Sequence, residues 1–188
     1  MSTVELELKA VVPDPEAVRA RVRAAGAVEA FRGRMSDRRF DRGGELGERD
    51  EVLRIRSYRG ADGTTEAVMG WKGPVRRSPE GYKQRAELEL PLGEGAASPH
   101  DFLAALGYDV VHAIDREVEV FRLGGATLRL ERYPRMDFLL EVEGEPAAIE
   151  RAIGASGLER SSFTADSLAE FVRRYEERTG RTAVLADS

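Results

Sequence analysis

The chain of 188 residues contains no cysteine and only two histidines, His100 and His112. The lack of cysteine excludes a disulfide scaffold, a thiolate metal site and a cysteine nucleophile. It fits a reducing compartment, and we expect a cytoplasmic protein. Neither histidine has a partner at a spacing typical of metal ligands, and no Gly-x-Ser-x-Gly motif supports a serine triad. Both histidines are therefore expected to be structural or exposed.

Long apolar segments are also missing. No run of residues approaches the ~18 consecutive apolar residues of a membrane helix, and the first residues, Met-Ser-Thr-Val-Glu-Leu-Glu, do not resemble a signal peptide. We therefore expect no membrane partner. The formal net charge of −5 argues against a nucleic-acid partner. No linker or repeat divides the chain, so one domain over 1–188 is expected, and the oligomeric state stays open.

Alternation of apolar and polar residues predicts about eight strands, and capping signals predict a few helices. The expected strands are 3–12, 28–41, 51–59, one ending near 72, 81–90 stopped by Pro91, 109–123, 126–133 and 138–143. The expected helices start after Asp14, after Ser98, at Pro146 and at 165. Turn signals between the predicted strands favour antiparallel pairing of consecutive strands. The expected fold class is α+β, an eight-stranded antiparallel β-barrel with helices packed on the outside.

The polar faces of the predicted strands are almost purely charged. The repeats are Glu5-x-Glu7-x-Lys9, Arg54-x-Arg56, Lys83-x-Arg85-x-Glu87-x-Glu89 and Glu141-x-Glu143. For any one strand, the alternative interpretation is a polar face exposed to solvent. Such faces usually mix several polar residue types. Like charges about 7 Å apart on one face repel unless a partner neutralises them.

The partners that these charges favour are a cation and an anion. A hard divalent cation, Mg²⁺ or Mn²⁺, suits the carboxylates, and a polyanion suits the arginines and lysines. The lysines add to this pattern, because only three of the 29 basic residues are lysine: Lys9, Lys72 and Lys83. We therefore predict a charged, water-filled tunnel through the barrel that holds a metal-bound phosphate compound.

Six ordered elements resemble the CYTH superfamily, also called triphosphate tunnel metalloenzymes, which includes class IV adenylate cyclases, thiamine triphosphatases and inorganic triphosphatases. They are Glu5-Leu6-Glu7-Leu8-Lys9 (the ExExK signature), Asp37 with Phe40, Leu53-Arg54-Ile55-Arg56, Lys72-Gly73-Pro74, Arg85-x-Glu87-x-Glu89, and the strand from Phe138 to Gly144. The resemblance implies an eight-stranded tunnel and a triphosphate substrate held with Mg²⁺ or Mn²⁺.

The resemblance also implies roles for single residues. Glu5, Glu7 and Lys9 are the expected catalytic residues. The expected metal ligands are Glu5, Glu7, Glu87, Glu131, Glu141 and Glu143. The expected phosphate-binding residues are Lys9, Arg54, Arg56, Lys72, Arg85 and Arg116. Two positions depart from the family pattern: Val118 stands where a second basic residue would follow Arg116, and Glu131 stands where the family usually has aspartate.

Three functions remain open from the sequence. The favoured one is a metal-dependent triphosphatase that acts on inorganic tripolyphosphate or an organic triphosphate, in which a water attacks the terminal phosphorus. The second is a class IV adenylate cyclase that makes cyclic AMP and pyrophosphate from ATP. The third is a non-catalytic polyphosphate binder, which the departures at Val118 and Glu131 keep open. Hydrolysis is favoured because it needs only a positioned water, and the sequence shows no adenine pocket.

Overall fold

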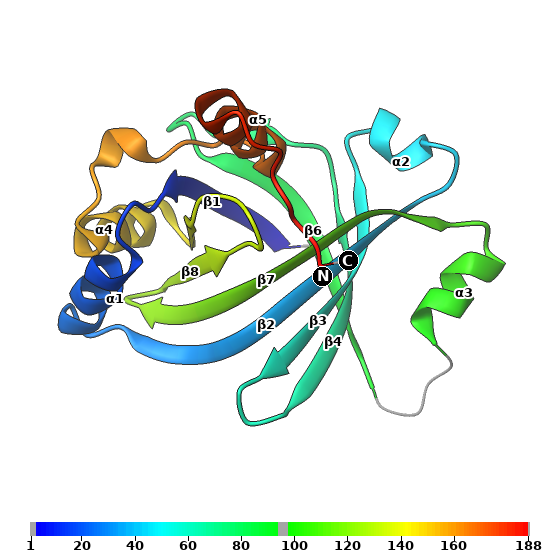
Figure 1. Cartoon of the computed structure of the whole chain (residues 1–188), viewed down its shortest axis with the longest axis horizontal. Coiled ribbons are helices and arrows are strands. Elements are labelled where there is room, and N and C mark those ends of the chain that lie inside the picture. Colours follow the sequence, from blue (N-terminus) through cyan, green and yellow to red (C-terminus); the bar gives the residue numbers. More distant parts are fainter. Residues whose placement is uncertain (1–2, 94–97, 188) are drawn as a thin grey trace.

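Nine antiparallel strands build the protein in a computed structural model that describes residues 3–93 and 98–187. The strands are β1 (Thr3–Val11), β2 (Val28–Asp41), β3 (Val52–Gly60), β4 (Thr65–Lys72), β5 (Arg76–Arg77), β6 (Lys83–Leu92), β7 (Asp109–Leu123), β8 (Ala126–Arg132) and β9 (Leu139–Glu143). Their order is β1-β9-β8-β7-β2-β3-β4-β6-β5, and pairing of β1 with β6 closes the sheet. Eight strands thus form the predicted barrel, and β5 adds to β6 (Figure 1).

Five α-helices and one 3₁₀ turn accompany the barrel. They are α1 (Pro15–Ala24), α2 (Glu45–Glu48), α3 (Pro99–Ala105), α4 (Pro146–Ser156), the turn Arg160–Ser162, and α5 (Leu168–Thr179). The predicted caps are present: the Asp14 side chain accepts a hydrogen bond from the Ala17 amide, and the Ser98 side chain accepts one from the Asp101 amide. Such caps satisfy amides that have no partner within the helix.

Strand alternation separates an apolar outside from a charged inside. On β1, Leu8 and Ala10 belong to a buried apolar cluster with residues of α1 and α4, such as Val22 and Ile149. Since neighbouring strand residues point to opposite faces, Glu7 and Lys9 point into the barrel. Both are buried. Helices α1 and α4 therefore cover the outside of β1, β8 and β9 and leave the lumen to charged groups (Figure 1).

Helix α5 covers one end of the barrel. Its Phe171 packs on Ile114, Tyr133 and Leu139, and strand alternation places Ile114 and Leu139 on the luminal face. The helix begins at Leu168, three residues later than predicted. Backbone hydrogen bonds between Lys9 and Thr164 tie the preceding segment to β1, and a capping box of Ser167 and Glu170 starts the helix after it.

The prediction that Pro91 stops a strand was wrong. Strand β6 continues to Leu92, and Pro91 pairs with Val68 of β4. Proline lacks an amide hydrogen, so it fits a strand where no neighbour needs that donor. The described pairing of β6 with β1 ends at Glu87. On the edge of β6 opposite β4, no described strand therefore needs an amide hydrogen from Pro91.

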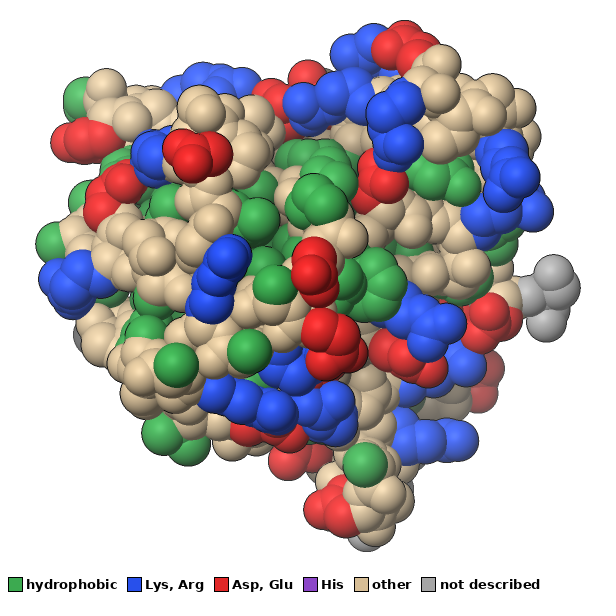
Figure 2. All heavy atoms as spheres, turned by 60° about the vertical axis from the view of Figure 1, so that its left-hand side comes forward, with side chains coloured by type: hydrophobic (Ala, Val, Ile, Leu, Met, Phe, Trp, Pro, Cys, Tyr) green, Lys and Arg blue, Asp and Glu red, His purple; other side chains and the backbone are tan. Residues whose placement is uncertain are grey.

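The many arginines of the surface lie among carboxylates. Figure 2 shows basic and acidic side chains interspersed over the face that carries α1 and α4. One network joins Arg19 of α1 to Glu119 of β7, which also binds Arg32 of β2. The side chains of Arg19 and Glu119 are largely buried, whereas Arg32 is exposed. In the described parts of the chain, no helix is long and apolar enough to cross a membrane.

Candidate functional site

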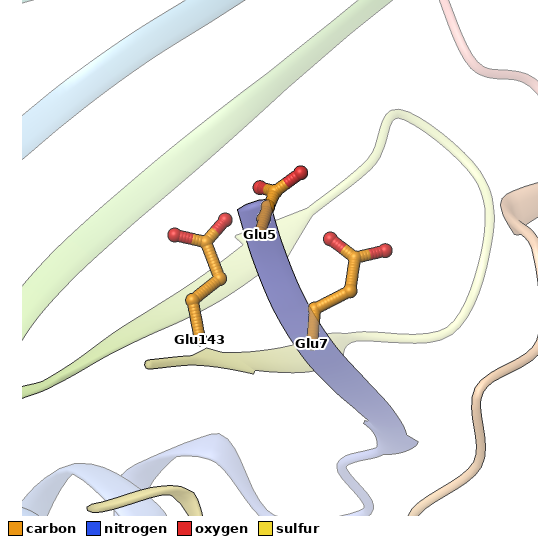
Figure 3. A group of neighbouring side chains, drawn as sticks. All are labelled: Glu5, Glu7 and Glu143. Atoms are coloured by element: carbon orange, nitrogen blue, oxygen red, sulfur yellow. The ribbon is translucent and has the colours of Figure 1, made fainter. Parts of the chain in front are cut away.

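Three glutamates gather in the lumen. Carboxylate oxygens of Glu5, Glu7 and Glu143 all lie within 4.8 Å of one another. Glu5 and Glu7 alternate on β1, and Glu143 is the register partner of Glu7 on β9, so the three side chains point to one side of the strands (Figure 3). We call these three residues the carboxylate cluster.

The carboxylates of the cluster differ in their pKa values. Burial alone would raise the pKa of Glu5, but the Lys72 ammonium and a hydrogen bond with Glu143 lower it to about 2. Burial raises the pKa of Glu143 well above its usual range, and the nearby charges of Glu141 and Glu5 add to that rise against the attraction of Arg129. The pKa values of Glu5 and Glu143 are therefore displaced in opposite directions.

The cluster fits a hard divalent cation. Its ligands are carboxylate oxygens, the donors that Mg²⁺ and Mn²⁺ prefer. Carboxylates this close together repel one another when ionised, and a divalent cation would neutralise their charge. Glu5, Glu7 and Glu143 would hold the ion.

The other glutamates predicted as metal ligands lie in the lumen but bind cationic side chains. Glu87 lies 3.2 Å from the Lys72 ammonium and 3.1 Å from the Arg54 guanidinium. Glu141 forms ion pairs with Lys9 and Arg129.

Glu131 is likewise engaged. It accepts hydrogen bonds from Arg116 at 2.8 Å and from the Tyr133 hydroxyl at 2.7 Å. The geometry thus brings Glu5, Glu7 and Glu143 together, and it places Glu87, Glu131 and Glu141 outside the cluster. Glutamates of both groups pair with luminal cations.

The predicted phosphate-binding side chains share the lumen. Lys9, Arg54, Arg56 and Arg116 are buried, and the Lys72 ammonium contacts Glu5 of the cluster. Arg85 differs, because its guanidinium donates hydrogen bonds to the backbone oxygens of Gly73 and Asp50. These contacts hold Arg85 beside the loop that follows α2.

Arg54 offers an unused donor. Its Nε is buried and has no hydrogen-bond partner among the described residues. The opposite position on β4 is Gly70, where an added Cβ would lie 3.4 Å from that nitrogen. A buried donor without a partner is unfavourable, so the lumen presents an unsatisfied N–H to an anion.

Sequence reasoning missed Arg129 and gave Asp37 no role. Arg129 of β8 forms ion pairs with Glu141, at 2.7 Å, and with Glu143 of the cluster. Its signal was the alternation Thr127-x-Arg129-x-Glu131, which places it on the same face as Glu131. Asp37 accepts two hydrogen bonds from Arg56. The sequence identifies Asp37 as a charged residue, but its pairing with Arg56 depends on the register of β2 with β3.

Lys83, which strand alternation alone placed on the charged face, lies at the cluster. Its ammonium is 2.5 Å from Glu7. Burial, together with the nearby Lys9 charge, lowers the pKa of Lys83. All three lysines of the chain therefore contact carboxylates in the lumen.

Val118 lies in the lumen, as its register with Glu131 requires. It is 1% exposed and packs with Met35 and Val120. The luminal wall is therefore apolar where the resemblance placed a second cation.

No family model and no curated protein matches the sequence. Solved structures do match its fold. The PH1819 protein of Pyrococcus horikoshii is 24% identical and aligns over 90% of this chain and 98% of its own, with a TM-score of 0.74.

Two further solved structures share the fold. An adenylate cyclase candidate from Vibrio parahaemolyticus is 17% identical over 92% of this chain and 99% of its own, with a TM-score of 0.72. The Hippeastrum protein HpAC1, an adenylyl cyclase candidate with a dominant triphosphatase activity, is 18% identical over the whole of both chains, with a TM-score of 0.63.

These likenesses establish the fold that the chain shares with the three proteins. The fold implied by the resemblance to the CYTH superfamily is thereby confirmed. A shared fold does not fix the chemistry, so the function is argued from the luminal site.

Proposed function

We propose that this protein is a CYTH-type, metal-dependent triphosphatase. The carboxylate cluster carries the proposal: three carboxylates within 4.8 Å lie in the same lumen as the buried cations Lys9, Arg54 and Arg56. A triphosphate held with a divalent cation needs both halves of this arrangement. The dominant triphosphatase activity of the Hippeastrum protein HpAC1 supports the same function.

The luminal cations would bind the phosphate chain. Arg54 has a buried N–H free for a phosphate oxygen, and Arg56 is held in place by Asp37. The luminal cations pair with carboxylates, so binding a triphosphate would exchange those partners for phosphate oxygens. Guanidinium and ammonium groups fixed in a buried site stabilise the charge that builds up on the transferred phosphoryl group.

The carboxylates would supply the other half of the chemistry. Glu5, Glu7 and Glu143 would hold Mg²⁺ or Mn²⁺, which when bound polarises a phosphate oxygen. A luminal carboxylate near the terminal phosphorus would accept a proton from the attacking water. Because these side chains are buried, each of these charged interactions is stronger than it would be in bulk water.

The cyclase alternative uses the same charges but a different nucleophile, the ribose 3′-hydroxyl acting on the α-phosphorus. The adenylate cyclase candidate from Vibrio parahaemolyticus keeps this reaction as the second proposal.

One assay separates the two reactions. Purified protein is incubated with Mg²⁺ or Mn²⁺ and, separately, with tripolyphosphate, ATP and thiamine triphosphate, and the products are identified. We expect inorganic phosphate. Cyclic AMP with pyrophosphate from ATP would replace the hydrolase by the cyclase, and tight tripolyphosphate binding without any product would favour a binder.

The metal assignment is tested with the double variant Glu5→Gln and Glu7→Gln. It should lose metal-dependent turnover and keep the circular dichroism spectrum of the native fold. The control is Glu117→Gln, which changes an exposed glutamate on the outer face of β7 that pairs with Arg132. Wild-type activity in the double variant would refute the metal assignment.

A further inference from the structure

One part of the luminal wall is apolar. Phe31, Met35, Tyr58, Val118 and Val120 form one cluster, which we call the apolar patch. The strand register puts them side by side, since Met35 pairs with Tyr58 and Phe31 pairs with Val120. The neighbouring luminal positions carry charges.

The patch lies on the far side of the charged region from α5. Along the luminal face of β7, Ile114 packs against α5, Arg116 pairs with Asp37, and Val118 and Val120 belong to the patch. A ligand whose charged part binds the cations can therefore extend an uncharged part away from α5 and onto the patch.

Two arginines border the patch. Arg56 and Tyr58 are alternate residues of β3 and share its luminal face. Arg129 of β8 is the register partner of Val120. The apolar surface is thus continuous with the region proposed to bind phosphate.

The outer layer of the patch is an aromatic pair. The Phe31 and Tyr58 rings meet edge to face, with centroids 5.4 Å apart and planes at 79°. Both rings are half-buried, whereas Met35 and Val118 beneath them are fully buried. The two rings are therefore the part of the patch that a ligand can contact.

From this arrangement we infer that the substrate is an organic triphosphate carrying a planar ring, and that Phe31 and Tyr58 bind this ring. The inference rests on the proposed function and narrows it. Inorganic tripolyphosphate is charged along its whole length and gains nothing from an apolar wall, whereas ring systems pack favourably on aromatic side chains. Val118, in place of a cation, enlarges the apolar wall at this position.

The test compares substrates in matched variants. In Tyr58→Ala and Phe31→Ala, KM for ATP or thiamine triphosphate should rise at least tenfold, and KM for tripolyphosphate should stay within twofold. Tyr58→Phe keeps the ring and should retain the wild-type KM for the organic substrate. Phe102→Ala, which changes an exposed ring on α3, is the control and should change neither value.

The outcomes separate the inference from the proposed function. An equal change for organic and inorganic substrates, or no change, overturns the inference and leaves the triphosphatase intact. If the alanine variants do not fold, the wild type decides: a KM for tripolyphosphate equal to or below that for both organic substrates overturns the inference. If no substrate is turned over, the proposed triphosphatase function is refuted. Calorimetric binding of ATP or thiamine triphosphate, weakened at least tenfold by Tyr58→Ala, would still support the ring subsite, and unchanged binding would overturn it.

Discussion

The Asp37 carboxylate holds the Arg56 guanidinium through two hydrogen bonds, Nε to Oδ1 at 2.7 Å and Nη2 to Oδ2 at 3.1 Å. Both side chains are buried, and Asp37 also lies 2.9 Å from Arg116. A planar guanidinium bound at two points is fixed in orientation. Asp37 thus positions two of the predicted phosphate-binding residues before any ligand arrives.

Asp37→Asn should destabilise the protein and weaken phosphate binding. Removing one partner of a buried ion pair leaves the other charge uncompensated and costs about 3–5 kcal/mol. Urea unfolding should show this loss, and the control Glu117→Gln, at an exposed pair, should change stability by less than about 1 kcal/mol. A loss in Asp37→Asn no larger than in the control would contradict the positioning role.

The same pair predicts how stability depends on pH. Burial alone would raise the pKa of Asp37, but Arg56 and Arg116 hold it well below its ordinary value. A carboxylate with a lowered pKa in the folded state contributes stability above its unfolded pKa of about 3.9 and loses it as pH falls toward the folded value. The free energy of unfolding should therefore decrease below about pH 4, measured by urea titration at successive pH values. Asp37→Asn should show a shallower decrease, and an identical pH profile would contradict this assignment.

Arg129→Met should change metal and substrate affinity in opposite directions. Arg129 pairs with Glu143 of the carboxylate cluster, so its removal frees that carboxylate for a cation and should tighten Mn²⁺ binding about tenfold, equivalent to about 1.4 kcal/mol. The loss of a luminal cation should raise KM for the triphosphate by a similar factor.

Arg132→Met is the matched control for this variant. It changes the neighbouring arginine of the β8 region whose side chain is exposed and pairs with Glu117. Mn²⁺ titration and steady-state kinetics should leave it at wild-type values. Weaker Mn²⁺ binding in Arg129→Met would mean that Arg129 supports the cluster instead of competing with the cation.

Gly33→Ala tests the close contact of β2 with β3. An added Cβ at Gly33 would lie 2.1 Å from the Arg59 carbonyl oxygen, so the strands would have to move apart at a loss of stability of roughly 1–3 kcal/mol.

Gly154→Ala is the opposite case, because that glycine lies on the exposed side of α4 with nothing within 4 Å of the added Cβ. It should raise stability by up to about 1 kcal/mol. Thermal unfolding of both variants checks the two signs.

The sequence predicted the barrel because its strands carry one clear alternation each. The alternation of Glu5, Glu7 and Lys9 against Leu6 and Leu8 required a charged and an apolar side, and the structure has both. The end of the barrel could not be predicted in this way. The apolar residues of α5, such as Leu168 and Phe171, indicate that the helix packs on the barrel. Its position over Ile114 and Leu139 depends on contacts between distant parts of the chain.

The luminal site could be predicted in composition but not in pairing. Residue type and strand face were enough to place Glu5, Glu7 and Glu143 in the lumen. The ion pairs among these side chains could not be predicted. The contacts of Glu141 with Lys9 and of Arg129 with Glu143 depend on the register of three strands. The same reason explains why Arg129 received no role.

Helix α5 also has a kinetic consequence. Because its Phe171 packs on Ile114 and Leu139 at one end of the lumen, we expect a ligand to enter and leave by the end away from this helix. Incoming substrate and outgoing phosphate would then use one passage in opposite directions. The turnover of such a site is sensitive to accumulated product, since a phosphate held by the luminal arginines blocks the path of the next substrate molecule.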